Sequence, residues 1–252
     1  MSARVALVTG ASRGIGATIA RALAGEGVHI VAAARSAEAL QAVVDALPTE
    51  SVALACDLVQ PDAAERLVDT AMQRFGRIDI VVNNAGATPR GDFLAFDDAA
   101  WQDGFALKFF GAARLCRVAW PHLVATQGCI VNIAGIGGRT GSAEFTIGGS
   151  VNAALLNFTK ALADRGVHDG VRVNAVNPSG IATERTQVRI DRLAAERGIA
   201  AADAARELAR ELRVARFGTP EEVAAVVAFL ASDAASYMQG AIVDVDGGQT
   251  RT

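Results

Sequence analysis

A glycine-rich loop near the N-terminus is the first segment whose residue types point to chemistry. Gly10, Gly14 and Gly16 follow an apolar run at 5–8 and precede a helical pattern. In such a context Gly10 permits a sharp turn, Gly14 lets the backbone approach a pyrophosphate, and Gly16 lets the helix pack closely on the strand. The free N–H groups at the start of the helix favour an anion. We therefore predict a dinucleotide site formed by Gly10, Ser12, Arg13, Gly14, Ile15 and Gly16. The alternative is that these glycines serve only a tight turn.

The charge that follows the second apolar run, 28–34, indicates which dinucleotide binds. An acidic residue there would hold a ribose 2′-hydroxyl and repel a 2′-phosphate, but this chain has Arg35. A guanidinium presents a fork of donors that matches a phosphate, and Arg13 in the glycine loop can present a second one. The sequence therefore predicts NADP(H) rather than NAD(H) as the cofactor. The alternative is that both arginines are simply solvated.

Further motifs make nearly the whole chain resemble the short-chain dehydrogenase/reductase family. The glycine loop is spaced Gly-x-x-x-Gly-x-Gly, and Asn-Asn-Ala-Gly at 83–86 follows the fourth apolar run. Segments 56–58, 178–183 and 244–248 also match the family pattern. The resemblance implies an adenine next to Asp57 and Leu58, and a nicotinamide carboxamide next to Ile181 and Thr183. The full set of cofactor contacts that it adds is Asp57, Leu58, Asn83, Ala85, Gly86, Pro178, Gly180, Ile181 and Thr183.

The chain departs from this family at the catalytic positions. Members of the family normally use an Asn, a Ser, a Tyr, and a Lys four residues after that Tyr. The corresponding positions here hold Lys108, Gly135, Gly148 and Asn152. The single tyrosine is Tyr237, just before the last apolar run, so no shift of the alignment restores the phenol. We therefore expect an enlarged, flexible pocket over the nicotinamide face.

Lys108 and Asn152 are the candidate catalytic residues, because Lys and Asn have exchanged positions relative to the family pattern. An ammonium at position 108 can polarise a carbonyl or enolate oxygen, or donate a proton if burial lowers its pKa. Asn152 can hydrogen bond the nicotinamide ribose. The alternative is that Lys108 only extends along the surface or pairs with an acid. Glu144 is a second candidate donor or base, although loop carboxylates are usually solvated.

Seven short apolar runs alternate with helical patterns and must position these groups. The runs are 5–8, 28–34, 52–56, 78–82, 129–134, 171–176 and 242–245. Helices are predicted over 17–25, 61–75, 101–126, 147–165 and 220–231. Apolar runs without polar alternation suit strands covered on both faces, and strand–helix alternation favours right-handed crossovers. We predict one α/β domain over residues 1–252, a doubly wound Rossmann fold with a seven-stranded parallel sheet.

A charged segment at 184–216 contains eight arginines and six acids. By the resemblance this segment is a helical substrate lid. Arg185, Arg189 and Arg192 lie nearest the cofactor segment and can meet an anionic substrate, such as a carboxylate, a phosphate or an acyl carrier. The alternative is a solvated face, which is the usual role of a mixed-charge helix.

Composition and charge exclude several classes of protein. Hydrophobic residues make up 51% and charged residues 20%, so the chain is not wholly disordered. A net charge of −3 gives no basic footprint for nucleic acid. Charges interrupt the first 30 residues and no long uncharged run follows, so we expect no membrane segment and a cytoplasmic protein. Three scattered cysteines and three histidines predict neither disulfides nor a metal site. The resemblance implies a homodimer or homotetramer.

The sequence thus predicts an atypical NADPH-dependent oxidoreductase that reduces an activated carbonyl or a conjugated C=C of a small molecule. The proton would come from Lys108 or from water. One alternative is a redox-inactive NADP(H)-binding protein, acting as a sensor or partner subunit. Another is a lyase or isomerase that keeps the dinucleotide as a scaffold and uses Lys108 electrostatically.

Overall fold

A computed structural model, which describes residues 3–250, contains one seven-stranded sheet in which all strands are parallel. The strands are β1 (Val5–Thr9), β2 (His29–Ala34), β3 (Ser51–Ala55), β4 (Ile80–Asn83), β5 (Cys129–Ile133), β6 (Arg172–Pro178) and β7 (Ile242–Val245). Their order is β3-β2-β1-β4-β5-β6-β7, so the direction of winding reverses between β1 and β4. The predicted doubly wound fold is confirmed. Ligands of such sheets bind outside the carboxyl ends of the strands at this reversal.

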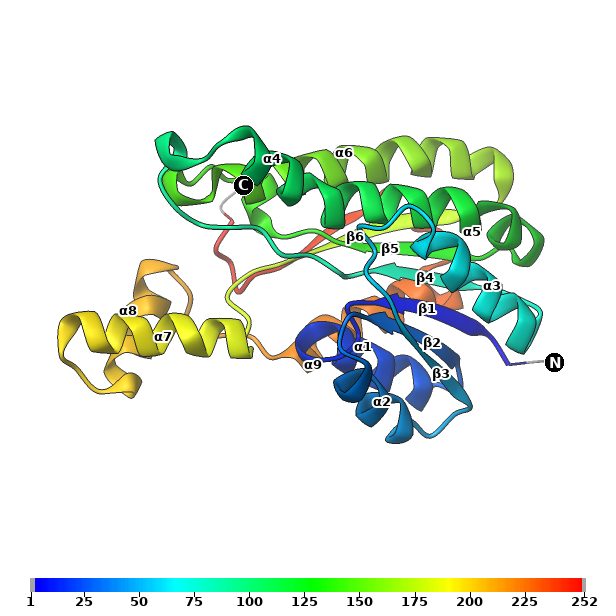
Figure 1. Cartoon of the computed structure of the whole chain (residues 1–252), viewed down its shortest axis with the longest axis horizontal. Coiled ribbons are helices and arrows are strands. Elements are labelled where there is room, and N and C mark those ends of the chain that lie inside the picture. Colours follow the sequence, from blue (N-terminus) through cyan, green and yellow to red (C-terminus); the bar gives the residue numbers. More distant parts are fainter. Residues whose placement is uncertain (1–2, 251–252) are drawn as a thin grey trace.

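Helices cover both faces of the sheet (Figure 1). One face carries α1 (Gly14–Gly25), α2 (Ala37–Asp45) and α9 (Pro220–Ala231); the other carries α3 (Ala63–Phe75), α5 (Ala112–Thr126) and α6 (Thr146–Asp169). Alternate residues of β1 enter opposite cores: Val8 packs with the first group of helices and Leu7 with the second. Because helices cover both faces of the sheet, most strand positions are apolar, which explains the mainly apolar runs. The buried exceptions, such as Asn132 and Asn174, are hydrogen bonded.

The region predicted as one helix over 101–126 is divided by a π-helical turn. Helix α4 (Asp98–Phe105) continues into η2 (Ala106–Gly111), which leads directly into α5. A π turn inserts an extra residue and is often found at functional sites. Lys108 lies in this turn. Short 3-10 turns complete the connections: η1 (Phe93–Ala95), η3 (Ile136–Gly138), η4 (Ala143–Phe145) and η5 (Asp233–Ala235).

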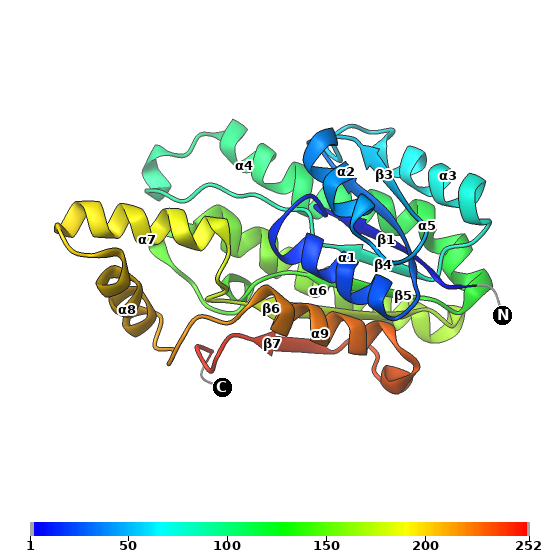
Figure 2. The same cartoon turned by 90° about the horizontal axis from the view of Figure 1, so that it is seen from below.

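The charged segment at 184–216 forms a hairpin of two helices that projects from the body of the protein (Figure 2). These are α7 (Glu184–Arg197) and α8 (Ala201–Glu211), joined at Gly198. The hairpin has a small core of its own around Ile190, Ala204 and Leu208. Across residues 3–250, no helix combines the length and the apolar character needed to cross a membrane.

Candidate active site

The glycine loop connects β1 to α1 at the carboxyl edge of the sheet. A Cβ atom on Gly16 would lie 2.3 Å from the carbonyl oxygen of Gly10, so α1 can approach the loop this closely only with glycine there. Around Gly14, by contrast, the nearest atom to an added Cβ would be Cγ2 of Thr183, at 3.9 Å. The space beside Gly14 is therefore open, and the first N–H groups of α1 have no intrahelical partners.

A hydrogen-bonded clamp joins this loop to the segment that follows β4. The Asn84 side-chain amide donates to the carbonyl oxygens of Thr9 and Gly10, at 2.9 and 3.2 Å. In return, Thr9 Oγ1 accepts from the main-chain N–H groups of Asn84 and Ala85, at 3.0 and 3.1 Å. The clamp holds the two loops together at the point where the winding reverses. Our sequence reasoning gave neither Thr9 nor Asn84 a role, although a polar pair directly after two buried strands was a usable signal.

The two arginines expected at a 2′-phosphate have different surroundings. Arg35 directly follows β2, is exposed, and forms no ion pair within the described part of the chain. Arg13 precedes α1, and its Nη1 lies 3.2 Å from a carboxylate oxygen of Glu184 at the start of α7. Both partners of this pair are exposed. Of the two arginines, only Arg35 is therefore without an ion pair to a described residue and available to bind a phosphate.

The other predicted cofactor contacts follow β3, β4 and β6, whose carboxyl ends share one edge of the sheet. Asn83 ends β4, but its amide is turned inward and donates to Asn132 Oδ1 at 2.8 Å and to Cys116 Sγ at 3.2 Å. Asp57 accepts the N–H of Val59 at 3.1 Å, which shapes the loop after β3. The side chain of Asn83 thus ties the sheet to α5, and only its main chain remains at the edge.

Lys108 points inward, toward the loop that follows β5. Its Nζ donates to the carbonyl oxygen of Ala134 at 2.5 Å. The methylene groups lie over Gly86, where an added Cβ would come within 2.9 Å of Lys108 Cδ. The carbonyl of Gly86 accepts a hydrogen bond of 3.3 Å from Arg185. Within residues 3–250 no acid pairs with Lys108, and the ammonium sits between the loops after β4 and β5.

The surroundings of Lys108 change its protonation. Burial, and to a lesser extent the positive charge of Arg185, together lower the pKa of Lys108 to about 7. At neutral pH the amine therefore exchanges readily between its charged and neutral forms. Such a pKa suits a group that gives a proton to a reacting atom.

The lowered pKa predicts that stability depends on pH through Lys108. An unfolded chain restores the ordinary lysine pKa, so from about pH 7 to pH 10 the unfolded state binds more protons than the folded state. Unfolding free energy should rise with pH in this window, by about 2 kcal/mol between pH 7 and 9 relative to Lys108→Met. Urea titrations of both proteins at these pH values would measure the difference. Equal pH slopes would contradict the buried position of the amine.

Asn152, the second candidate, lies on the other side of the same loop. The residue is only 4% exposed, and its buried Oδ1 has no hydrogen-bond partner among residues 3–250. A Cβ on Gly135 would lie 3.0 Å from Asn152 Nδ2, and Gly135 has a φ of +148°, which favours glycine. Lys108 contacts Ala134 and Asn152 contacts Gly135. Because Ala134 and Gly135 are neighbours in the loop after β5, the two candidate catalytic residues lie on either side of that loop.

The enlarged pocket expected where Gly148 replaces the family's tyrosine is not found, because the space beside this glycine is filled. A Cβ on Gly148 would lie 2.1 Å from Cζ of Phe145, so the phenyl ring occupies the volume beside this glycine. The ring also contacts Gly137, where a Cβ would lie 3.0 Å from it. The guanidinium of Arg90 stacks on the ring, 4.2 Å from the centroid. Sequence reasoning missed Phe145 because nothing local indicates that its ring folds back over the following helix turn.

This packing predicts that Gly148→Ala destabilises the protein. The added methyl would meet the Phe145 ring, and such overpacking costs about 1–3 kcal/mol. Shortening the ring partner in Phe145→Ala/Gly148→Ala should remove the clash, which gives a favourable coupling in a double-mutant cycle. Gly141→Ala is the matched control, since an added Cβ there meets nothing within 4 Å. Denaturant unfolding measures the natural protein, the single variants Phe145→Ala and Gly148→Ala, the double variant and Gly141→Ala. Equal losses for positions 141 and 148 would refute the packing argument.

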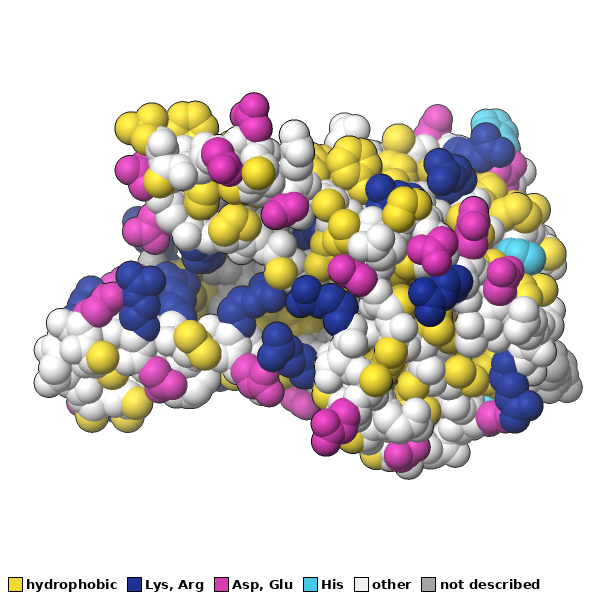
Figure 3. Space-filling view, viewed as in Figure 1, with side chains coloured by type: hydrophobic (Ala, Val, Ile, Leu, Met, Phe, Trp, Pro, Cys, Tyr) yellow, Lys and Arg dark blue, Asp and Glu magenta, His cyan; other side chains and the backbone are white. Residues whose placement is uncertain are grey.

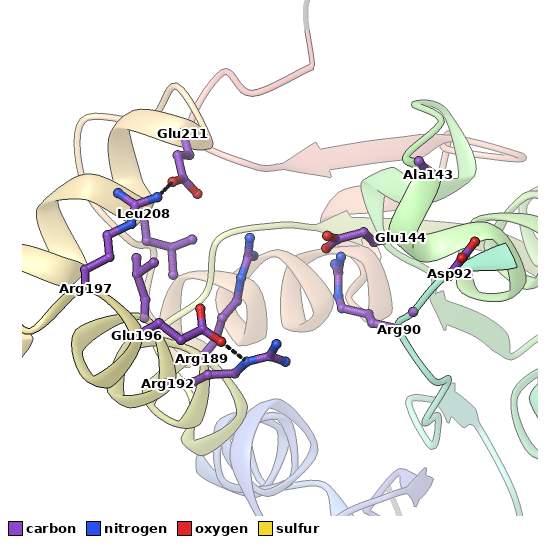
Figure 4. Close-up of a pocket in the computed structure, with 12 residues that line it drawn as sticks. Arg90, Asp92, Ala143, Glu144, Arg189, Arg192, Glu196, Arg197, Leu208 and Glu211 are labelled. Carbon is purple, nitrogen blue, oxygen red and sulfur yellow. Dashed lines mark hydrogen bonds and ion pairs between the residues drawn. The ribbon is translucent and has the colours of Figure 1, made fainter. Parts of the chain in front are cut away.

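A cavity of about 560 Å³ opens between the α7–α8 hairpin and the loops after β4 and β5 (Figure 4). Its walls come from segments 90–92 and 143–144 and from the hairpin residues Arg189, Arg192, Leu193, Glu196, Arg197, Leu208 and Glu211. The predicted lid segment thus forms one wall, and the loop carrying Phe145 lies at the other.

A parallel sheet wound in this order, with a glycine loop at the reversal, defines a Rossmann-type α/β protein. Residues 10–250 match the family model described as enoyl-(acyl carrier protein) reductase. The chain is 35% identical over 252 residues to meso-2,3-butanediol dehydrogenase from Serratia marcescens, covering 98% of this chain and 94% of that protein. It is 36% identical over 255 residues to 3-oxoacyl-[acyl-carrier-protein] reductase from Synechocystis sp., covering 98% and 97%.

A solved structure agrees with these sequence relatives. L-sorbose reductase from Gluconobacter frateurii, complexed with NADPH and L-sorbose, superposes with a TM-score of 0.94 at 33% identity, over 100% of this chain and 98% of that one. The chain therefore belongs to the short-chain dehydrogenase/reductase family, which confirms the family resemblance.

Proposed function

We propose that this protein is an NADPH-dependent reductase of a small molecule that contains an activated carbonyl or a conjugated C=C. In this proposal the active site is atypical, and Lys108 takes over the role of the missing tyrosine. The observation that carries the proposal is the inward ammonium of Lys108, held by the carbonyl of Ala134 at the carboxyl edge of the sheet. Relatives described as reductases and dehydrogenases support the reaction class.

The open space beside Gly14, at the start of α1, fits the pyrophosphate of a dinucleotide. No side chain fills the space at Gly14, so the backbone can approach a pyrophosphate, and the exposed, unpaired Arg35 is available for a 2′-phosphate. The NADPH bound in the structure of L-sorbose reductase supports the same choice of cofactor. When bound, NADPH supplies a hydride. The buried Oδ1 of Asn152 lacks a partner and offers an acceptor for a ribose hydroxyl.

Lys108 would act on the oxygen of the substrate. Its Nζ has three protons, of which one is donated to Ala134 and two are available to a carbonyl oxygen. Such hydrogen bonds stabilise negative charge that develops on the oxygen. For a carbonyl substrate Nζ then gives up a proton to that oxygen. For a conjugated C=C, Nζ stabilises the oxygen while water protonates the carbon, so no phenol at Gly148 is needed.

Segment 184–216 would be the substrate lid in this scheme. Its hairpin has a core of its own and forms one wall of the cavity, as a lid that closes over a substrate requires. The Arg13–Glu184 pair connects the glycine loop to the start of the hairpin.

A panel of ketones, enones and enoyl thioesters tests the reaction class. Purified protein incubated with NADPH should show loss of nicotinamide absorbance with at least one of these compounds. NADPH binding without any such loss would favour the redox-inactive sensor or partner subunit. Product formed at constant absorbance would favour a lyase or isomerase. Either result would overturn the reductase.

A further inference from the structure

The cavity beside the lid carries two arginines that form no ion pair with any described residue, and this deepens the proposed function, on which it rests, by naming a substrate class. Dark-blue basic side chains gather along the hollow between the hairpin and the body of the protein (Figure 3). Four arginines line the cavity, together with four acids. The distribution of ion pairs decides which of these charges remain available to a ligand.

Two of the arginines are already neutralised by acids of the same hairpin. Arg192 lies 2.6 Å from Glu196, and Arg197 lies 3.0 Å from Glu211 and also pairs with Glu207. Asp92, a third acid, accepts the N–H of Leu94 at the start of a short helical turn. The paired arginines therefore hold the walls of the cavity and are not available to a ligand, while Asp92 keeps its negative charge.

The lining charges that form no ion pair with a described residue are Arg90, Arg189, Glu144 and Asp92. Figure 4 shows the ends of Arg90 and Arg189 directed into the space between the hairpin and the Glu144 loop. Arg189 forms no ion pair with any described residue. Burial lowers the pKa of Arg90, and so does the positive charge of Arg189, while the charge of Glu144 raises it. Two cations that repel each other across a cavity are stabilised by an anion placed between them.

The guanidinium of Arg90 is also oriented to bind an anion in the cavity. This group stacks on Phe145, the ring that fills the space beside Gly148. An arginine held flat on an aromatic ring keeps its fork of donors pointed in one direction. The Phe145 ring therefore fills the space beside Gly148, where the family has a tyrosine. It also holds the Arg90 guanidinium at the edge of the cavity.

We propose that Arg90 and Arg189 bind a carboxylate of the substrate. The two arginines can hold one carboxylate between them, and because Glu144 and Asp92 also face the cavity, a monoanionic carboxylate meets less repulsion there than a dianionic phosphate. Arg185 lies one turn before Arg189 on α7 and donates to Gly86, the residue on which Lys108 packs. The basic residues Arg189, Arg185 and Lys108 thus follow one another from the carboxylate site to the proposed proton donor. The substrate would be an oxo acid or an unsaturated acid, anchored at one end and reduced at the other.

Calorimetric titration of the full-length protein, with and without NADPH, tests this site without turnover. The probes are hexanoate, hexanamide and inorganic phosphate. Hexanoate should bind about tenfold or more tightly than hexanamide, and Arg90→Met and Arg189→Met should each weaken hexanoate binding about tenfold or more. Arg206→Met is the matched control, because it removes the same charge from α8 outside the cavity. Arg90→Lys should recover only part of the binding, since it keeps the charge without the fork.

Three results would overturn the carboxylate site: hexanoate binding no tighter than hexanamide or not at all, equal affinity in the Arg90 and Arg189 variants, or phosphate binding as tightly as hexanoate. Thermal melting of each variant shows whether it is folded. Lys108→Met should still bind hexanoate. A failed reduction panel with intact hexanoate binding would therefore remove the reductase and leave the carboxylate site standing, and the reverse outcome would remove only the site.

Discussion

Replacing Lys108 with Met is expected to lower turnover with NADPH at least about 100-fold, because a positioned proton donor typically contributes that much or more. NADPH affinity should change little, since the glycine loop and Arg35 do not contact Lys108. Methionine retains the packing over Gly86 but removes the Nζ that donates to Ala134. Steady-state rates with a compound found in the panel, and NADPH binding by fluorescence, measure the two quantities separately.

Lys160→Met provides the matched control, because Lys160 is the other lysine of the chain and lies exposed on α6. Lys160→Met should reduce the substrate at the same steady-state rate as the natural protein. With carbonyl substrates the natural protein should also lose kcat/KM as the pH rises through about 7, where the Lys108 ammonium loses its proton. Unchanged turnover in Lys108→Met would refute the role of this residue.

Reversing the charge at Arg35 should change the preference between cofactors. In Arg35→Asp, NADPH affinity is expected to fall about 100-fold, because a charge-assisted pair is lost and a carboxylate then faces the 2′-phosphate. NADH affinity should stay equal or improve, since an acid at this strand end can accept from a ribose 2′-hydroxyl. Titration of both cofactors against both proteins gives the ratio directly.

Arg117→Asp is the control for the general effect of charge reversal. Arg117 is exposed on α5, on the opposite face of the sheet from α1. The affinities of Arg117→Asp for NADPH and for NADH should match those of the natural protein. If Arg35→Asp binds NADPH normally, or if the natural protein binds NADH more tightly, the assignment of NADP(H) fails.

Local signals predicted the fold well. The run 242–245 and the helix 220–231 agree with β7 and α9 residue by residue. For α9 the reason is local: Pro220 occupies the first turn, and Thr219 and Glu222 cap each other's N–H groups. The helix predicted at 101–126 was less accurate, because a π turn is imposed by packing rather than by residue type.

The sequence by itself determined the layered fold, the glycine loop and the absence of a tyrosine near Gly148, since these depend on local pattern and composition. Only the tertiary structure decided three further points: that Lys108 turns inward to Ala134, that Phe145 fills the space at Gly148, and that Arg90 and Arg189 remain unpaired beside a cavity. The physical reason is that the direction of a side chain and the partner of a charge depend on segments far away in the chain. Arg90 and Arg189 face one cavity only because the sheet and the lid bring them together.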